Sequence, residues 1–158
     1  MSVLQRLIGL ALRQLVRRKA QGLSLEAVVA SLEEYGTNLD ARIAHAPDTP
    51  ANREVVNHWV GIERWSLRRV RVARGEPLVL DGYRAYREPE GATLPELNGA
   101  MRAAREATLA LARDLQRTGF DHGLTIPHNH LGPLTVVEWF VYIDQHTRRE
   151  AIRLRGKA

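Results

Sequence analysis

Apolar residues recur every three to four positions along most of this chain, which is the spacing of one face of an α-helix. The clearest stripe lies within residues 24–45 and comprises Val28, Val29, Leu32, Tyr35, Leu39 and Ile43. A second stripe lies within residues 95–118 and comprises Leu97, Met101, Ala104, Thr108, Leu111 and Leu115. No segment has an alternating pattern long enough to predict a strand. The sequence therefore predicts an all-α fold.

Helix-starting and helix-ending residues divide the chain at matching places. Ser24 is suited to cap a helix, and Thr135 with Glu138 has the pattern of a capping box. Gly75 and Gly119 are natural helix stops. We therefore predict four core helices, at about 24–45, 49–74, 95–118 and from 135 onward. Residues 76–91 and 121–133 are predicted to be irregular connections long enough to cross the end of a bundle.

An additional amphipathic helix is predicted within residues 1–22, ahead of the bundle at 24–155. Its apolar stretch is interrupted by Gln5, Arg6, Arg13 and Gln14, so it is too polar to span a membrane. A basic amphipathic helix can contact a membrane surface. We instead expect it to pack on the bundle or on a second subunit.

Composition narrows the class of protein. The 158 residues suit one domain, and 44% hydrophobic with 26% charged residues is typical of a globular protein. The absence of cysteine excludes disulfides, thiolate metal sites and a cysteine nucleophile. The net charge of +5 comes mostly from arginines interleaved with glutamates, which indicates a salt-bridged surface. We expect a single cytoplasmic domain, 1–158, with no nucleic-acid or membrane partner.

Three side chains stand out as candidate metal ligands. His146 and Glu150 are four residues apart on one otherwise apolar helix face, and His58 lies on a similar face of an earlier helix. Imidazole and carboxylate groups buried together need a partner, and they suit zinc, nickel, manganese or iron. The alternative is a His146–Glu150 pair with His58 satisfied separately.

Two further groups are weaker candidates. Arg69 falls on the His58 face and could bind an anionic group of a substrate or cofactor, or it could instead pair with a glutamate. His122, His128 and His130 lie together in the second irregular segment, where histidines are usually exposed. His130 could instead lie at the mouth of the bundle and reach toward a substrate or cofactor.

Several of these residues carry a family resemblance. The run NHWVGIERW at 57–65 resembles the second core helix of the DinB/YfiT-like superfamily of damage-inducible bacterial proteins, which are unrelated to the polymerase of that name. The run from His130 to Trp139, followed by His146 and Glu150, is similar to that family's last helix. The resemblance implies a four-helix bundle, often dimeric, with three metal-binding histidines. His58 and His146 match two of them, whereas Glu150 stands where histidine is usual.

The resemblance also implies a function. Some members are thiol-dependent S-transferases that use bacillithiol, mycothiol or glutathione, one branch isomerises maleylpyruvate, and many have no assigned reaction. We expect a divalent-metal-dependent enzyme, a homodimer, that transfers a low-molecular-weight thiol to small electrophiles in a stress response. Glutamate at position 150 would favour a harder metal such as manganese or iron. The alternative is a non-catalytic, dimeric stress-response bundle that has lost the metal site.

Overall fold

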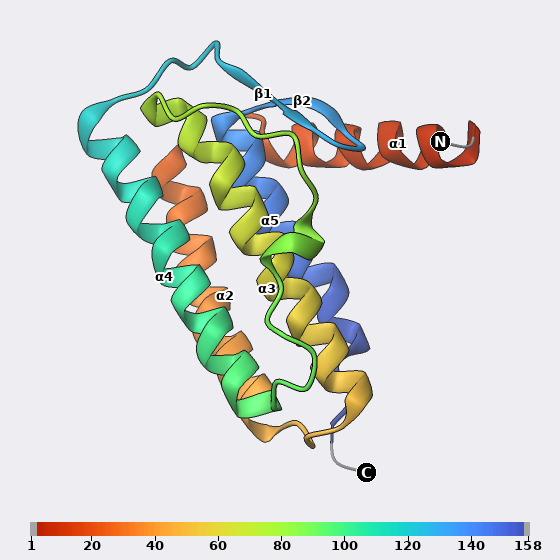
Figure 1. Cartoon of the computed structure of the whole chain (residues 1–158). Helices are drawn as coiled ribbons and strands as arrows, with labels where there is room; N and C mark the ends of the chain where they lie inside the picture. Colours follow the sequence, from red (N-terminus) through yellow and green to blue (C-terminus); the bar gives the residue numbers. More distant parts are fainter. Residues whose placement is uncertain (1–2, 157–158) are drawn as a thin grey trace.

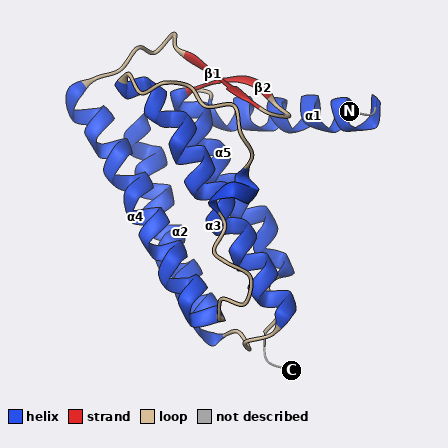
Figure 2. Cartoon of the chain, in the orientation of Figure 1, coloured by secondary structure: helices blue, strands red, loops and turns tan. Residues whose placement is uncertain are grey.

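The chain folds mostly into α-helices, which confirms the all-α prediction. The structure, a computed structural model, describes residues 3–156, with side chains from residue 9. These residues form five α-helices and a small two-stranded sheet (Figures 1 and 2). The helices are α1 (Val3–Ala20), α2 (Leu25–His45), α3 (Pro50–Val70), α4 (Leu94–Thr118) and α5 (Val136–Glu150). Three short 3-10 helices are η1 (Arg71–Arg74), η2 (Tyr83–Tyr86) and η3 (Ala151–Arg153).

Four of the helices pack around a common interior. Both α2 and α3 contact α4 and α5, so each of these helices has two neighbours. The fifth helix, α1, contacts α5 and projects sideways from the end of the four packed helices that lies near the hairpin (Figure 1). The interior contains two apolar clusters, one around Leu32 and Trp139 near the sheet and one around Trp59 and Leu97 toward the opposite end.

Polar caps begin the helices where the sequence places them. The side chains of Ser24 and Thr49 accept hydrogen bonds from backbone amides in the first turns of α2 and α3. Thr135 and Glu138 form the predicted capping box of α5. These bonds satisfy amides that have no partner within the helix, so each helix has a defined start.

The segment 121–133 is not wholly irregular, which corrects the prediction. Strand β1 (Thr125–His128) pairs with β2 (Gly132–Thr135) in an antiparallel hairpin, with Ile126 opposite Leu134. Both of these side chains are buried against the helices. Two prolines, Pro127 and Pro133, face each other in the middle of the hairpin. Proline normally argues against a strand, and four-residue strands are too short for their alternation to be distinctive.

The connection at residues 75–93 is held along α3. Asn57 of α3 exchanges two hydrogen bonds with the backbone of Glu88, at 3.1 and 2.8 Å. Gly61 faces η2 so closely that an added Cβ would lie 2.8 Å from the carbonyl oxygen of Tyr83 and 2.7 Å from Cγ of Arg87. The missing side chain of Gly61 therefore lets this connection approach the helix. As a result, Tyr83 is held over α3.

Candidate functional site

Two of the predicted site residues lie side by side between α3 and α5. The ring centroids of His58, on α3, and His146, on α5, are 5.2 Å apart with an interplanar angle of 47°. Tyr83 meets His58 edge-on at 4.9 Å, and Tyr142, one turn before His146, lies 5.6 Å from the His146 ring. The two imidazoles thus lie between two phenol rings, one from η2 in the 75–93 connection and one from α5.

Both imidazoles are uncharged at neutral pH. Burial lowers the pKa of His58, and burial together with the nearby His58 lowers the pKa of His146 to about 3. The Nδ1 atom of His146 is buried and has no hydrogen-bond partner within the described part of the chain. An unsatisfied buried polar atom costs about 1–3 kcal/mol. A neutral imidazole nitrogen of this kind can act as a ligand for a cation.

Glu150 lies near both histidines, and its carboxylate is bonded to Arg153. Burial raises the pKa of Glu150, but a hydrogen bond from Arg153 and electrostatic interactions with His146, Arg153 and His58 together lower it below its usual range. Nη1 of Arg153 donates to Oε2 of Glu150 at 2.6 Å. Within residues 3–156, no group of three or more histidine, cysteine, aspartate or glutamate side chains is placed to hold a metal ion. The three predicted ligands are therefore neighbours, with the third engaged by an arginine.

Arg69 is buried at the end of α3 and its Nη atoms are engaged in bonds to two connections. Nη1 donates to the carbonyl of Pro127 at 3.2 Å, and Nη2 donates to the carbonyl of Asp81 and to Oδ1 of Asn129. Desolvation lowers the pKa of the guanidinium. These bonds join the 75–93 connection to the hairpin, which favours a structural role over the predicted binding of a cofactor.

The three histidines of the second connection have different surroundings. His122 and His130 are exposed, as predicted for this segment. His128 is buried among aromatic rings, 5.1 Å from Trp65 and 4.6 Å from Tyr142. His130 lies in the hairpin turn, with its ring centroid 6.3 Å from that of His128.

The burial of His128 was not predicted from the sequence. Its Nδ1 accepts the backbone N–H groups of His130 and Leu131, both at 3.1 Å, so the ring proton resides on Nε2. Burial lowers its pKa to about 3. Its position two residues after the buried Ile126, on the same strand face, is the only sequence signal for its burial.

A buried ion pair was also missed. Arg105 of α4 donates to both carboxylate oxygens of Glu63 on α3, at 2.7 and 2.9 Å, and Nη1 donates to the carbonyl of Leu32 on α2 at 3.1 Å. Only 5% of Arg105 and 1% of Glu63 are exposed. The sequence indicates this pair only in that Glu63 and Arg105 are each a single charged residue on the apolar face of a helix.

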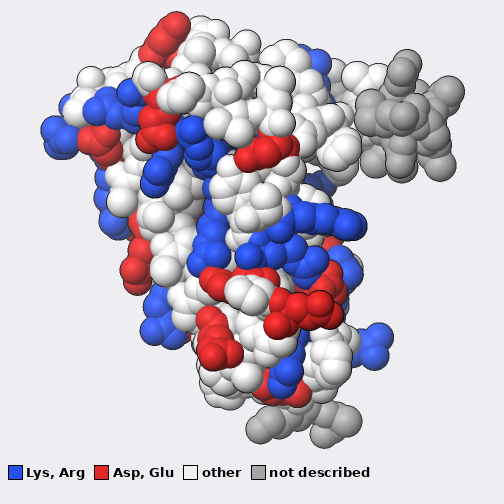
Figure 3. Space-filling model, viewed as in Figure 1, with Lys and Arg blue, Asp and Glu red and all other residues white. Residues whose placement is uncertain are grey.

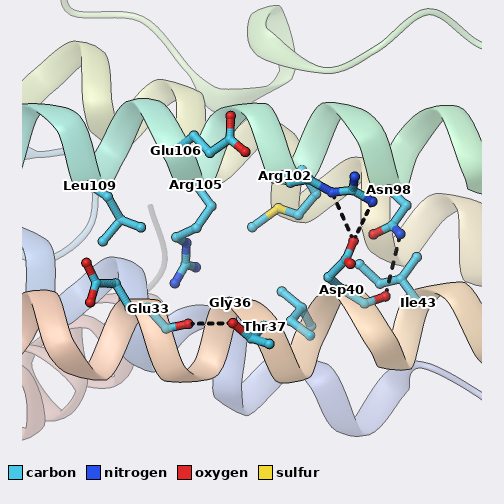
Figure 4. A pocket seen from close by; sticks show the side chains of 12 residues that line it. Glu33, Gly36, Thr37, Asp40, Ile43, Asn98, Arg102, Arg105, Glu106 and Leu109 are labelled. Carbon is cyan, nitrogen blue, oxygen red and sulfur yellow. Dashed lines mark hydrogen bonds and ion pairs between the residues drawn. The ribbon is translucent and has the colours of Figure 1, made fainter.

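A groove with a volume of about 310 Å³ opens between α2 and α4, close to this ion pair (Figure 4). Its walls include Leu39, Met101 and the aliphatic part of Arg105, and Asp40 and Arg102 are paired across its rim at 2.9 Å. None of its lining residues belongs to the His58–His146 cluster. Figure 3 shows acidic and basic residues interspersed over one face of the molecule, in agreement with a salt-bridged surface.

Comparisons with known proteins identify no relative for this chain. No family model matches it, and no curated protein and no solved structure matches it. Functional assignment therefore depends on the geometry of the imidazole pair and on the resemblance of its sequence motifs.

Proposed function

We propose that the chain is a four-helix bundle of the DinB/YfiT-like type, with an extra N-terminal helix, and that His58 and His146 are ligands of a divalent transition metal. The observation that carries the proposal is the pair of neutral, adjacent imidazoles with an unpartnered, buried Nδ1 on His146. In α-helical bundles, metal sites are formed by side chains that project inward from facing helices. The two histidines on α3 and α5 have this arrangement.

Glu150 is the third ligand in this proposal. To bind the metal, its carboxylate leaves Arg153 and turns toward His146. Its carboxylate accepts a hydrogen bond from Arg153, a side chain in η3 that is exposed to solvent. Because ion pairs near solvent contribute only about 0–1 kcal/mol, losing this pair costs little when the carboxylate turns toward His146. The net charge of the site would become more negative, which favours a hard or borderline ion such as manganese, iron or zinc.

The proposed reaction is transfer of a low-molecular-weight thiol onto a small electrophile, by analogy with the family. A divalent ion held by these residues would lower the pKa of a bound water or thiol. Tyr83 and Tyr142 flank the imidazoles and limit the access of water. Burial raises the pKa of Tyr142, so its phenol stays protonated.

Metal binding is tested on the full-length, untagged protein. Its metal content is measured after growth in supplemented medium, and its thermal midpoint is measured with added zinc, nickel or manganese. An ion at about one hundred times its Kd should stabilise the protein by about 2.7 kcal/mol, which corresponds to about 5–11 °C for a chain of this length. His58→Ala and His146→Ala should abolish this shift, whereas the exposed control His122→Ala should retain it.

The role of Glu150 is tested by releasing it from its arginine. Arg153→Gln should strengthen metal binding, and Glu150→Gln should weaken it. The exposed Arg84→Gln removes the same charge elsewhere and should change neither. A wild-type protein without metal, or a His146→Ala variant with full metal content, would refute the metal site.

A second candidate function is supported by the Glu150–Arg153 pair itself. A bundle that has lost its metal would keep Glu150 engaged by Arg153, as in this structure. The two functions are separated by an assay of the conjugation of glutathione with chlorodinitrobenzene. In this reaction the thiol sulfur displaces chloride from the aromatic ring, and the thiol proton passes to solvent. Metal-stimulated conjugation that is lost in His58→Ala supports the enzyme. The absence of both metal binding and conjugation with any of the family's thiols supports the non-catalytic stress-response bundle.

A further inference from the structure

The entire net charge of the chain resides in α1. This helix contains Arg6, Arg13, Arg17, Arg18 and Lys19 and no acidic residue. The chain has 23 basic and 18 acidic residues, so the 18 basic residues outside α1 balance the 18 acidic ones. A net charge of +5 concentrated in 18 residues attracts polyanions, whereas the remainder of the molecule is neutral overall.

One side of α1 packs on the body of the protein. Val16 is buried, and a Cβ added at Gly9 would overlap the carbonyl oxygen of His130 in the hairpin turn. Arg13 donates to the carbonyl of Pro133 at 3.1 Å, and Arg17 pairs with Glu138 at 3.4 Å. These contacts hold the C-terminal half of α1 against the hairpin and α5, and its N-terminal end extends past the hairpin (Figure 1).

The opposite side of α1 presents leucines to solvent. Leu10 is 56% exposed and Leu15 is 51% exposed, with the exposed Ala11 between them on the helix surface. At 100° per residue, these positions lie away from the side that contains Gly9 and Val16. Arg18 and Lys19, both exposed, follow in the last turn. At 100° per residue, Leu10 and Leu15 lie about 140° apart, with Ala11 and Arg18 between them, so the outer side of α1 presents apolar and cationic side chains together. A helix surface of this kind can contact an anionic membrane interface.

We propose that α1 binds the surface of an anionic lipid bilayer. The helix lies parallel to the bilayer, with Leu10 and Leu15 at the acyl-chain boundary and Arg18 and Lys19 on lipid phosphates. Within residues 3–156, no helix is long and apolar enough to cross a membrane. This differs from the expectation that α1 packs only on protein.

Charge and exposure select lipid over the other possible partners. A second copy docked through the same face would bring Arg18 and Lys19 of both copies together, and α1 has no acidic residue to pair with them. Such a contact is repulsive. Nucleic acid would satisfy the cations, but it would leave the two exposed leucines in water. An anionic bilayer satisfies both groups of side chains.

The test is co-sedimentation of the full-length protein with lipid vesicles. Vesicles of phosphatidylcholine are compared with vesicles that contain about one-third phosphatidylglycerol, at low and at high salt. We expect binding to the anionic vesicles, weakened by salt. Arg18→Gln with Lys19→Gln should lower the partition coefficient about thirty-fold, from the usual contribution of each cation near an anionic surface.

Matched variants keep the test specific to α1. Leu10→Ser with Leu15→Ser should also abolish binding, whereas Leu78→Ser with Leu80→Ser, which changes two exposed leucines elsewhere, should not. Arg84→Gln with Arg155→Gln is the charge control. Circular dichroism verifies that each variant is folded.

Three results would overturn the proposal. The first is no binding to anionic vesicles, or equal binding to both kinds of vesicle. The second is equal loss of binding in the α1 variants and their controls. The third is a dimer that dissociates when Leu10 and Leu15 are changed, or retention on DNA, in the absence of vesicle binding. The test is independent of the proposed metal site, because His58→Ala should bind vesicles normally.

Discussion

Replacing Arg105 by methionine should destabilise the protein more than any comparable change on the surface of α4. Methionine has a similar length, so the substitution removes the charge while leaving most of the volume filled. It leaves Glu63, which is 1% exposed, as a buried carboxylate without its cation, and it removes a donor from the carbonyl of Leu32. Removing one partner of a buried ion pair costs about 3–5 kcal/mol. For a chain of this size, the thermal midpoint should fall by about 6–20 °C.

The assay is urea and thermal unfolding followed by circular dichroism, with Arg102→Met as the control. Arg102 lies one turn earlier on α4 and pairs with Asp40, but its side chain is 58% exposed. Its loss should therefore cost less than about 1 kcal/mol. The double variant Glu63→Leu with Arg105→Met should regain much of the stability, because the unpaired charge is gone. Equal effects at positions 102 and 105, or no recovery in the double variant, would refute this reasoning.

Two further predictions concern Gly61, where η2 packs on α3, and the buried His128. Gly61→Ala should destabilise the protein by about 1–3 kcal/mol in urea unfolding, because the new Cβ meets the backbone of Tyr83; Gly99→Ala, with nothing within 4 Å of the new Cβ, should instead be stabilising. Burial lowers the pKa of His128 from its usual 6.5 to about 3, so between these values the unfolded chain binds a proton that the folded chain does not. Stability should therefore fall by about 1.4 kcal/mol for each pH unit below 6.5 on account of this residue, and His128→Gln should reduce the measured dependence of unfolding free energy on pH by about one proton.

The helices could be predicted from the sequence because their signals are local. Caps such as Ser24 and Thr135 satisfy amides in their own first turn, and stops such as Gly75 depend on the backbone of one residue. The proximity of His58 and His146 could also be predicted, since each lies on the apolar face of its helix and such faces pack together. Local chemistry and periodicity were sufficient for both.

The remaining features depend on contacts between distant segments. The hairpin is stabilised by the burial of Ile126 and Leu134 against helices, which its four-residue strands do not reveal. The orientation of Glu150 toward Arg153 depends on the turn at η3, where a side chain three residues away competes with His146. Sequence spacing places the Glu150 carboxylate on a helix face. It does not decide whether that carboxylate contacts the cationic Arg153 or the neutral His146.

Buried polar bonds also fix the register in which the helices pack. Ser31 of α2 donates to Asp144 of α5 at 3.2 Å, and Arg105 of α4 donates to the carbonyl of Leu32, the next residue of α2. Apolar faces alone would tolerate a slip of α2 by one turn, about 5.4 Å. Such a slip would leave Asp144 and Arg105 without these partners. We infer that these bonds select one alignment of the helices, on which the 5.2 Å separation of the two imidazoles depends.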